Sequence, residues 1–203
     1  MIMTIKCIEI GALGVNTYFL TENGCDCIVV DPGDDEQSIQ KFLTENGLKA
    51  QAVLLTHAHF DHSNGVKFLQ EKGATVYMHR GDMRMLNSHE NLAVYCGRQF
   101  NAFSVDVFVE DGKSYQICGI DFTIMHTPGH SEGSVCYILS DAIISGDTLF
   151  YLSVGRTDFP GGSVAKLRAS LQKLFALKKD YEVYPGHGQS TSLYFEKENN
   201  PYA

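Results

Sequence analysis

Three histidines and one aspartate fall between His57 and His62, directly after the apolar run 52–55. Imidazole and carboxylate groups are ligands that suit zinc, manganese and iron, and spacings this short let several of them converge on one ion. In extended backbone, residues two apart point the same way, so His57 and His59 can hold one ion. If a helix follows, it turns Asp61 and His62 toward a second ion. The alternative is a polar helix start, but a cap needs only one of these side chains. The stretch therefore predicts a metal site.

The bulk composition narrows the class of protein. A chain of 203 residues with 44% hydrophobic content and a formal charge of −8 is typical of a globular protein, and we expect one compact domain over residues 1–203. The acidic balance disfavours a nucleic-acid surface, which needs clustered Lys and Arg. No apolar stretch approaches the roughly 18 residues of a membrane span, and residues 1–6 lack the apolar core of a signal peptide. We therefore expect a cytoplasmic protein with a small-molecule substrate and neither a nucleic-acid nor a membrane partner.

The six cysteines lie singly along the chain, without a Cys-x-x-Cys pair. We predict that they are buried thiols without a role in metal binding.

Strands are predicted where short apolar or alternating runs are bounded by turn residues. These runs cover residues 3–10, 17–21, 25–31, 52–55, 75–78, 103–109, 115–117, 121–126, 135–139, 142–145 and 181–184. The first three form a β-meander, because Asn23-Gly24 and the glycines at 11 and 14 are turn signals.

Three helices are predicted from apolar residues at helical spacing. The first is capped by Asp34 or Asp35 and ends near Asn46, the second runs from Val66 to Gly73, and the third opens at Ser163. Residues 80–103 show no clean period, and the tail 196–203 is predicted to be loose.

Three further ligand-type residues share one context. His130, Asp147 and His187 each follow an apolar, strand-like run, and a glycine directly precedes each of them. A glycine lets the backbone turn sharply as it leaves a sheet. A single histidine in a Pro-Gly turn is more often structural, so the prediction depends on the agreement among all three. We expect them to meet the His-rich stretch at one sheet edge.

Four motifs together resemble the metallo-β-lactamase-fold hydrolases, and most closely glyoxalase II. They are His-x-His-x-Asp-His at 57–62, Thr-Pro-Gly-His at 127–130, Gly-Asp-Thr-Leu-Phe at 146–150 and Pro-Gly-His-Gly at 185–188. The match covers nearly the whole chain in the family's order. It implies an α/β fold, a four-layered αββα sandwich, with a binuclear metal centre at one end.

The resemblance also implies a ligand set. It places His57, His59 and His130 on the first metal, Asp61, His62 and His187 on the second, and Asp147 as a bridge between them. We predict two divalent ions, with zinc favoured and iron or manganese left open. Asp61 and Asp147 are the predicted catalytic carboxylates.

The sequence departs from glyoxalase II at its end. Only sixteen residues follow His187, whereas glyoxalase II continues into a helical domain with basic glutathione contacts. The stretch 155–162 resembles a short, single-domain branch. Substrate contacts are then expected from residues 83–103 and 151–162, with Tyr151 and Arg156 as candidates. Arg156 either pairs with a substrate carboxylate or forms an internal ion pair.

Hydrolysis is the predicted reaction, because a water bound between two metal ions has its pKa lowered toward neutrality and becomes an available hydroxide. We predict a glyoxalase II-like thioesterase that cleaves S-lactoylglutathione or a related small acyl thioester. One alternative is an iron-dependent sulfur dioxygenase of this fold, with a two-His, one-carboxylate site. Another is a non-catalytic binding module stabilised by metal. A β-lactamase is disfavoured because those binuclear enzymes usually have Cys at the place of Asp147, and a nuclease is disfavoured by the acidic charge.

Overall fold

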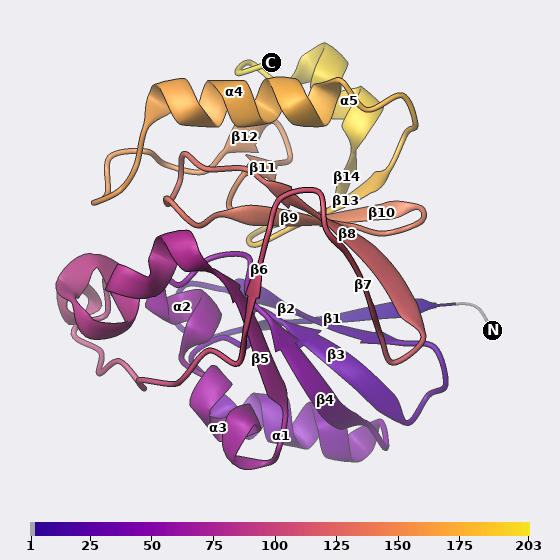
Figure 1. The fold of residues 1–203 in the computed structure, drawn as a ribbon, viewed down its shortest axis with the longest axis vertical. Coiled ribbons are helices and arrows are strands. Elements are labelled where there is room, and N and C mark those ends of the chain that lie inside the picture. Colours follow the sequence, from indigo (N-terminus) through magenta and orange to yellow (C-terminus); the bar gives the residue numbers. More distant parts are fainter. Residues whose placement is uncertain (1–2) are drawn as a thin grey trace.

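The computed structural model describes residues 3–203, in which two six-stranded sheets are stacked face to face. Helices α1 (Glu36–Glu45) and α3 (Val66–Glu71) cover the outer face of the first sheet, and α4 (Val164–Phe175) and α5 (Leu193–Asn199) cover that of the second (Figure 1). The predicted α/β architecture, a four-layered αββα sandwich, is confirmed.

The first sheet has the strand order β1-β2-β3-β4-β5-β6. Its first three strands pair antiparallel, as the predicted meander requires, and β3 to β6 run parallel. The bounds are β1 Thr4–Ile10, β2 Val15–Thr21, β3 Asp26–Val30, β4 Lys49–Leu54, β5 Thr75–His79 and β6 Val107–Val109.

The second sheet has the order β14-β13-β10-β9-β8-β7, and β10 and β13 are its one parallel pair among the described strands. A short hairpin, β11 (Leu149–Phe150) with β12 (Ser153–Val154), lies outside both sheets. The remaining bounds are β7 Ser114–Ile117, β8 Ile120–His126, β9 Val135–Ile138, β10 Ala142–Gly146, β13 Glu182–Pro185 and β14 Thr191–Ser192.

The core is divided by the sheets into three layers. In β2 all seven residues are buried. Val15 and Phe19 pack toward the helices below, while Tyr18 and Leu20 pack between the sheets. A strand covered on both faces gains by burying apolar groups on each of them, so its sequence loses the polar alternation of an exposed sheet.

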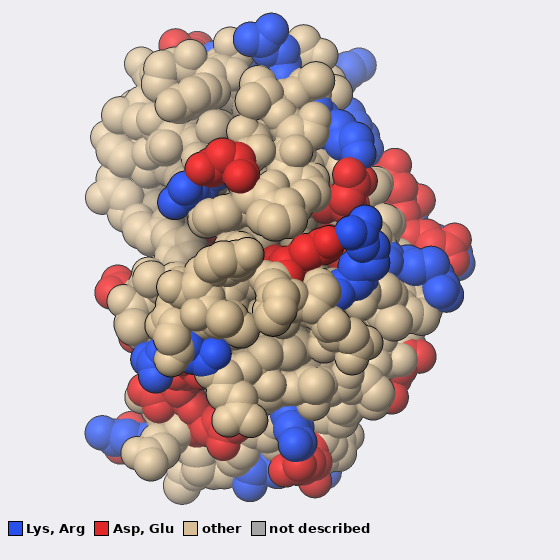
Figure 2. All heavy atoms as spheres, turned by 90° about the vertical axis from the view of Figure 1, so that its left-hand side faces the viewer, with Lys and Arg blue, Asp and Glu red and all other residues tan. Residues whose placement is uncertain are grey.

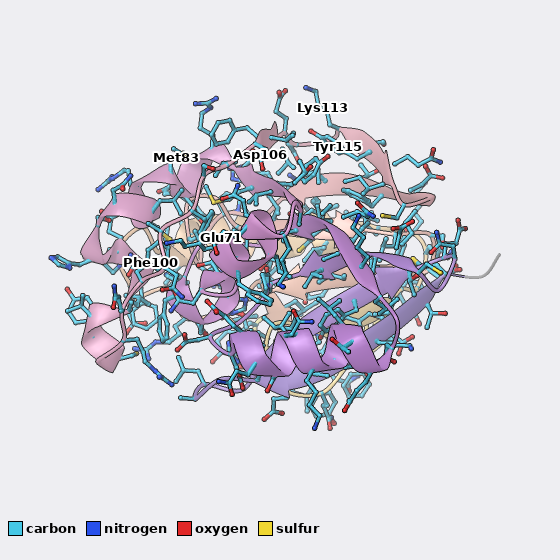
Figure 3. All side chains as sticks on the ribbon, turned by 90° about the horizontal axis from the view of Figure 1, so that it is seen from below. Glu71, Met83, Phe100, Asp106, Lys113 and Tyr115 are labelled. Carbon is cyan, nitrogen blue, oxygen red and sulfur yellow. The ribbon has the colours of Figure 1, made fainter. Side chains whose placement is uncertain are left out.

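The predicted caps position the helices. The Asp35 carboxylate accepts from the Ser38 backbone N–H at 3.0 Å, and Ile39 and Leu43 on the same face are buried. Ser163 caps α4 through Lys166 N–H. Viewed from below, α1 lies across the first sheet, and Glu71 marks the end of α3 beside it (Figure 3).

Two predicted segments differ from the structure. The strand predicted from residue 103 begins only at Val107. The first four residues of the tail predicted to be loose, 196–199, are helical as the end of α5. The buried Glu196 carboxylate anchors this helix, since it accepts from Thr191 Oγ1 at 2.6 Å and from the Leu152 backbone N–H at 2.9 Å. Such a carboxylate looks like a surface charge in sequence, because its partner Leu152 is 44 residues away in the chain.

The aperiodic segment 80–103 contains three 3₁₀ helices, η1 (Arg80–Asn87), η2 (His89–Asn91) and η3 (Val94–Cys96). Three residues per turn do not produce the α-helical pattern, which explains the missing period. Phe100 and Phe103 follow η3 and pack against the first core layer, with Phe100 at the side of the molecule (Figure 3).

The prediction that all cysteines are buried is wrong. Cys27 and Cys136 are buried, but Cys7, Cys25 and Cys96 are exposed because they lie at a strand face, a turn and η3. Within residues 3–203, none of the helices is both long and apolar enough to cross a membrane.

Candidate metal centre

The seven predicted ligand residues gather at one edge of the sandwich. The His-rich stretch leaves the end of β4 and enters α2 (Phe60–Ser63), whose short helical turn carries Asp61 and His62. Asp147 and His187 follow the parallel strands β10 and β13, and the carboxyl ends of parallel strands meet at one edge. The two sheets are tied there by the Asn16 N–H, which donates to the Gly186 carbonyl at 2.7 Å.

His57, His59 and His130 form the first cluster. All three are buried, and their ligand nitrogens lie within 4.8 Å of one another. His59 Nδ1 is 2.9 Å from His130 Nε2, while His57 Nε2 is buried without a hydrogen-bond partner. The three nitrogens therefore face a common point.

Asp61, His62 and His187 form the second cluster, with its ligand atoms also within 4.8 Å of one another. The Nε2 atoms of His62 and His187 are 3.2 Å apart, and Asp61 Oδ2 lies 3.3 Å from His187 Nε2.

Asp147 lies between the clusters and contacts both. Its Oδ1 is 3.3 Å from His62 Nε2, and its Oδ2 is 3.5 Å from His130 Nε2. The preceding Gly146 has a φ of +50°, as expected for a sharp turn out of the strand. Gly186 has another reason to be glycine: a Cβ there would lie 2.3 Å from Asp147 Oδ1.

Three of the outer imidazole nitrogens are held by a partner behind the centre, namely those of His62, His130 and His187. His62 Nδ1 lies 2.9 Å from Asp31 Oδ2, and His130 Nδ1 donates to the Arg156 carbonyl at 2.8 Å. His187 Nδ1 donates to the Gly14 carbonyl at 3.2 Å. These bonds place the proton on Nδ1 and leave Nε2 as a free lone pair toward the centre, as metal-binding histidines require.

The chemistry of this donor set fits metal ions. His57 Nε2 and Asp147 Oδ1 are buried side-chain atoms of the clusters without a hydrogen-bond partner. A buried polar atom left unpaired costs about 1–3 kcal/mol, so imidazole lone pairs are not gathered around a point without compensation. A divalent cation at each cluster would satisfy them.

The pKa shifts of His57, His59 and Asp147 agree with this assignment. Burial, followed by repulsion from His130, lowers the pKa of His59 to about 3, and burial also lowers the pKa of His57 well below its usual value. Burial raises the pKa of Asp147, but His62, His130 and His187 together hold it below its ordinary value. Neutral imidazoles and an ionised carboxylate are the forms that bind metals.

The carboxylates around His62 favour a positive charge on its ring. Burial opposes its protonated form, yet Asp147, Asp61 and Asp31 raise its pKa well above the usual value. These carboxylates therefore stabilise positive charge at this end of the centre, which a divalent cation supplies in place of the proton.

Two buried carboxylates were missed by the sequence analysis. Asp31 directly follows β3, in the same context as the other ligands, so that signal could have found it. Asp82 lies in η1 and accepts from the Ala58 backbone N–H at 3.1 Å, from Ser131 Oγ at 2.8 Å and from the Gly133 N–H at 2.6 Å. Asp82 thereby joins the loop of His57 and His59 to the loop of His130.

A cavity of about 750 Å³ opens over the centre. Five of the seven candidate ligands line its floor: His59, Asp61, His130, Asp147 and His187.

The two predicted substrate contacts differ in position. Arg156 is in the cavity lining, but Tyr151 is not, since its ring stacks on Phe195 with the centroids 5.5 Å apart. Arg156 forms an internal ion pair with Asp158, which is one of the two arrangements expected from sequence.

Residues 10–187 match the model of the Metallo-beta-lactamase superfamily. The chain belongs to this superfamily. Among its relatives, the Bacillus subtilis protein named "Probable metallo-hydrolase YqgX" is 36% identical, with 95% of this chain and 94% of the relative aligned. The Haemophilus influenzae protein named "Hydroxyacylglutathione hydrolase GloC" is 30% identical, with 98% of each chain aligned. The chain is accordingly similar over nearly its whole length to a probable metallo-hydrolase and to a hydroxyacylglutathione hydrolase.

Three solved structures are similar to this chain over nearly its whole length. A structure named BLEG-1 B3 metallo-beta-lactamase has a TM-score of 0.92 and 34% identity, with 98% of this chain and 99% of that one covered. TTHA1623 in a di-iron-bound form has a TM-score of 0.87 and 35% identity, covering 98% and 100%. ETHE1 from Myxococcus xanthus has a TM-score of 0.79 and 27% identity, covering 98% and 83%.

Proposed function

We propose that this protein is a binuclear metal-dependent thioesterase of the glyoxalase II type, which hydrolyses S-lactoylglutathione or a related small acyl thioester. The observation that carries the proposal is the position of Asp147, with one oxygen 3.3 Å from His62 of the second cluster and the other 3.5 Å from His130 of the first. A carboxylate in this position is suited to bridge two ions.

The residues have distinct roles in this proposal. His57, His59 and His130 would hold the first ion, Asp61, His62 and His187 the second, and Asp147 would contact both. Two divalent ions would supply Lewis-acid polarisation of the substrate carbonyl and a water acidic enough to act at neutral pH. Because such a water would be the nucleophile, no side-chain nucleophile is needed. Asp31 and the carbonyls of Arg156 and Gly14 hold the imidazoles in orientation.

Two aromatic rings of the cavity lining, Phe150 and Phe159, border the centre. Phe159 stands edge-on to His59, with centroids 5.8 Å apart, and Phe150 stands edge-on to His187 at 6.2 Å. A substrate carbonyl that enters between these rings reaches the ligand cluster in a less polar environment, where electrostatic stabilisation is stronger.

One relative supports the proposed thioester hydrolysis, and one solved structure supports the proposed pair of metal ions. The name of the Haemophilus influenzae relative gives hydrolysis of hydroxyacylglutathione, and TTHA1623 binds two irons. Zinc is our first choice of ion because it accepts both imidazole ligands and a leaving thiolate, while iron and manganese suit the same donor set.

The experiment is a thioesterase assay on protein whose metal content has been measured. Protein with two zinc ions per chain is expected to release thiol from S-lactoylglutathione or from other acyl thioesters, and chelation is expected to abolish the release. Absence of release from every thioester, at two ions per chain, would overturn the proposal.

Two alternatives are tested on the same samples. An iron-dependent sulfur dioxygenase would consume oxygen with a persulfide substrate and require one iron at the site drawn from His57, His59, His130 and Asp147. A non-catalytic module would bind metal and gain stability, but would turn over neither substrate class. Either result in place of thiol release would replace the thioesterase assignment.

A further inference from the structure

The wall of the cavity over the metal centre is mainly apolar. Side chains of this kind come from the turn after β1, from α2, from the η2–η3 segment and from the β11–α4 region: Leu13, Phe60, Leu92, Tyr95, Phe150, Val154, Phe159 and Pro160. Tyr95 and Leu13 are 74% and 51% exposed, which leaves their surfaces available to a ligand. The face of the molecule in Figure 2 is mostly uncharged, with basic and acidic groups lying side by side at scattered points.

Arg156 is the one Lys or Arg among the residues that line this cavity. Its guanidinium donates twice to Asp158, from Nε to Oδ1 at 2.9 Å and from Nη2 to Oδ2 at 2.7 Å. The same group lies 4.2 Å above the Phe159 ring. This pair occupies the Nε–Nη2 edge of the guanidinium and offsets its charge, so a second carboxylate would find only the Nη1 side and a weaker attraction.

The backbone of this loop adds a further constraint. The Arg156 carbonyl accepts from His130 Nδ1, and the Phe159 ring stands edge-on to His59 and His130. Rotation of the loop toward an incoming anion would therefore disturb a candidate metal ligand. Asp158 also lines the cavity, so a substrate carboxylate that approached Arg156 would meet a like charge beside it.

We propose that Asp158 determines specificity by neutralising Arg156, so that the cavity selects uncharged thioesters with an apolar acyl or thiol portion over anionic ones such as glutathione esters. This inference rests on the proposed thioesterase function and narrows its substrate class. A glutathione ester brings two carboxylates and one ammonium group, and the cavity wall leaves the carboxylates without an unpaired cation. An alkyl chain, in contrast, meets apolar surface on several sides.

The first arm of the test compares turnover. We expect the wild-type enzyme with bound metal to show at least a tenfold higher kcat/KM for S-hexanoyl-N-acetylcysteamine, which is uncharged, than for S-lactoylglutathione. Among uncharged esters, kcat/KM should rise with acyl length by up to about fourfold per methylene, the gain for burying one methylene group. Asp158→Asn keeps the shape of the side chain and removes its charge. We expect this variant to raise the kcat/KM for the glutathione ester, relative to that for the uncharged ester, about tenfold.

A matched control separates this local effect from net charge. Glu110 pairs with Lys113 at 2.8 Å and is not in the cavity lining, so Glu110→Gln makes the same change in total charge elsewhere. We expect this control to leave the substrate ratio within twofold of the wild type. An equal rise in both variants would overturn the role of Asp158.

The second arm measures binding without turnover. Calorimetry with S-hexylglutathione and S-hexyl-N-acetylcysteamine, two thioethers that cannot be hydrolysed, is expected to show tighter binding of the uncharged thioether in the wild type. Asp158→Asn should tighten only the binding of S-hexylglutathione. If no thioester is hydrolysed, the thioesterase function fails, but these affinities still decide the specificity. If S-lactoylglutathione is the preferred substrate and Asp158→Asn leaves the ratio unchanged, the specificity inference fails while the thioesterase function stands.

Discussion

Asp31 lies behind His62, with its Oδ2 2.9 Å from His62 Nδ1 and 2.6 Å from Thr56 Oγ1. Its other oxygen accepts from the Thr56 backbone N–H at 2.7 Å. The residue is buried and has a φ of +49°, a conformation that Asp and Asn tolerate better than most residues. Asp31 thus orients His62, a candidate ligand of the second ion. It also anchors the loop that carries His57 and His59, the candidate ligands of the first ion.

We expect Asp31→Asn to weaken metal binding at the second cluster by about 10–100-fold, the usual effect of losing a carboxylate behind a ligand imidazole. Asn keeps the size and the backbone preference, so the fold should be retained. Competition with a chromophoric chelator gives the affinities of both ions. Unchanged affinities would show that Asp31 serves the turn alone.

Asp82 gives a complementary prediction for the first cluster. Because it joins the loops of His57, His59 and His130, Asp82→Asn places an amide N–H against one of three donors. We expect weaker binding of the first ion, by about tenfold or more, and lower stability. Chelator competition measures the metal affinity and thermal unfolding measures the stability, both on one preparation. Lower stability with two unchanged metal affinities would reduce Asp82 to a structural role.

Asp147→Ala is predicted to lower thioester turnover more than replacement of any single histidine ligand. The reason is geometric, because Asp147 contacts both clusters while each imidazole belongs to one. Steady-state kcat/KM of the purified variants ranks them. Turnover within about tenfold of the wild type, or about 1.4 kcal/mol in the barrier, would contradict a bridging role for Asp147.

The positions of the candidate ligands were predictable, because each ligand motif comes soon after a strand-like run. For Asp147 and His187 the two strands, β10 and β13, are parallel and end at a common edge. Gly146 has the positive φ expected of a sharp turn, whereas Gly186 is required for a different reason, its close approach to Asp147. The role of Asp82 could not be predicted, since its three partners come from two loops that meet only in the folded chain. The internal pair of Arg156 remained one of two alternatives because sequence does not show which carboxylate reaches the guanidinium.

A stacked histidine pair predicts a pH-dependent contribution to stability. His79 lies on His126 with centroids 4.0 Å apart, and burial, followed by His126, lowers the pKa of His79 to about 4. Its unfolded value is about 6.5, so the unfolded chain takes up a proton that the folded chain refuses until about pH 4. The free energy of unfolding must therefore fall as the pH drops through this window.

In the wild type the Gly81 backbone N–H donates to His79 Nδ1 at 3.1 Å. His79→Asn removes the titrating ring and keeps an acceptor for this N–H. Between pH 7 and pH 4.5 we expect the variant to lose about 1 kcal/mol less stability than the wild type, after a discount for solvent screening. Urea unfolding of both proteins in the same metal state checks this, since acid release of the metals cancels in the difference. Equal losses of stability in the two proteins would show that groups other than His79 cause the acid sensitivity.

The binuclear thioesterase assignment is tested most directly by titrating metal-free protein with zinc while thioester turnover and bound metal are measured on the same sample. The account predicts that two ions bind per chain, that turnover reaches its maximum only after the second, and that Asp61→Ala lowers both the second binding step and the turnover. Saturation of binding and turnover at one ion, with Asp61→Ala equal to the wild type in both, would contradict it.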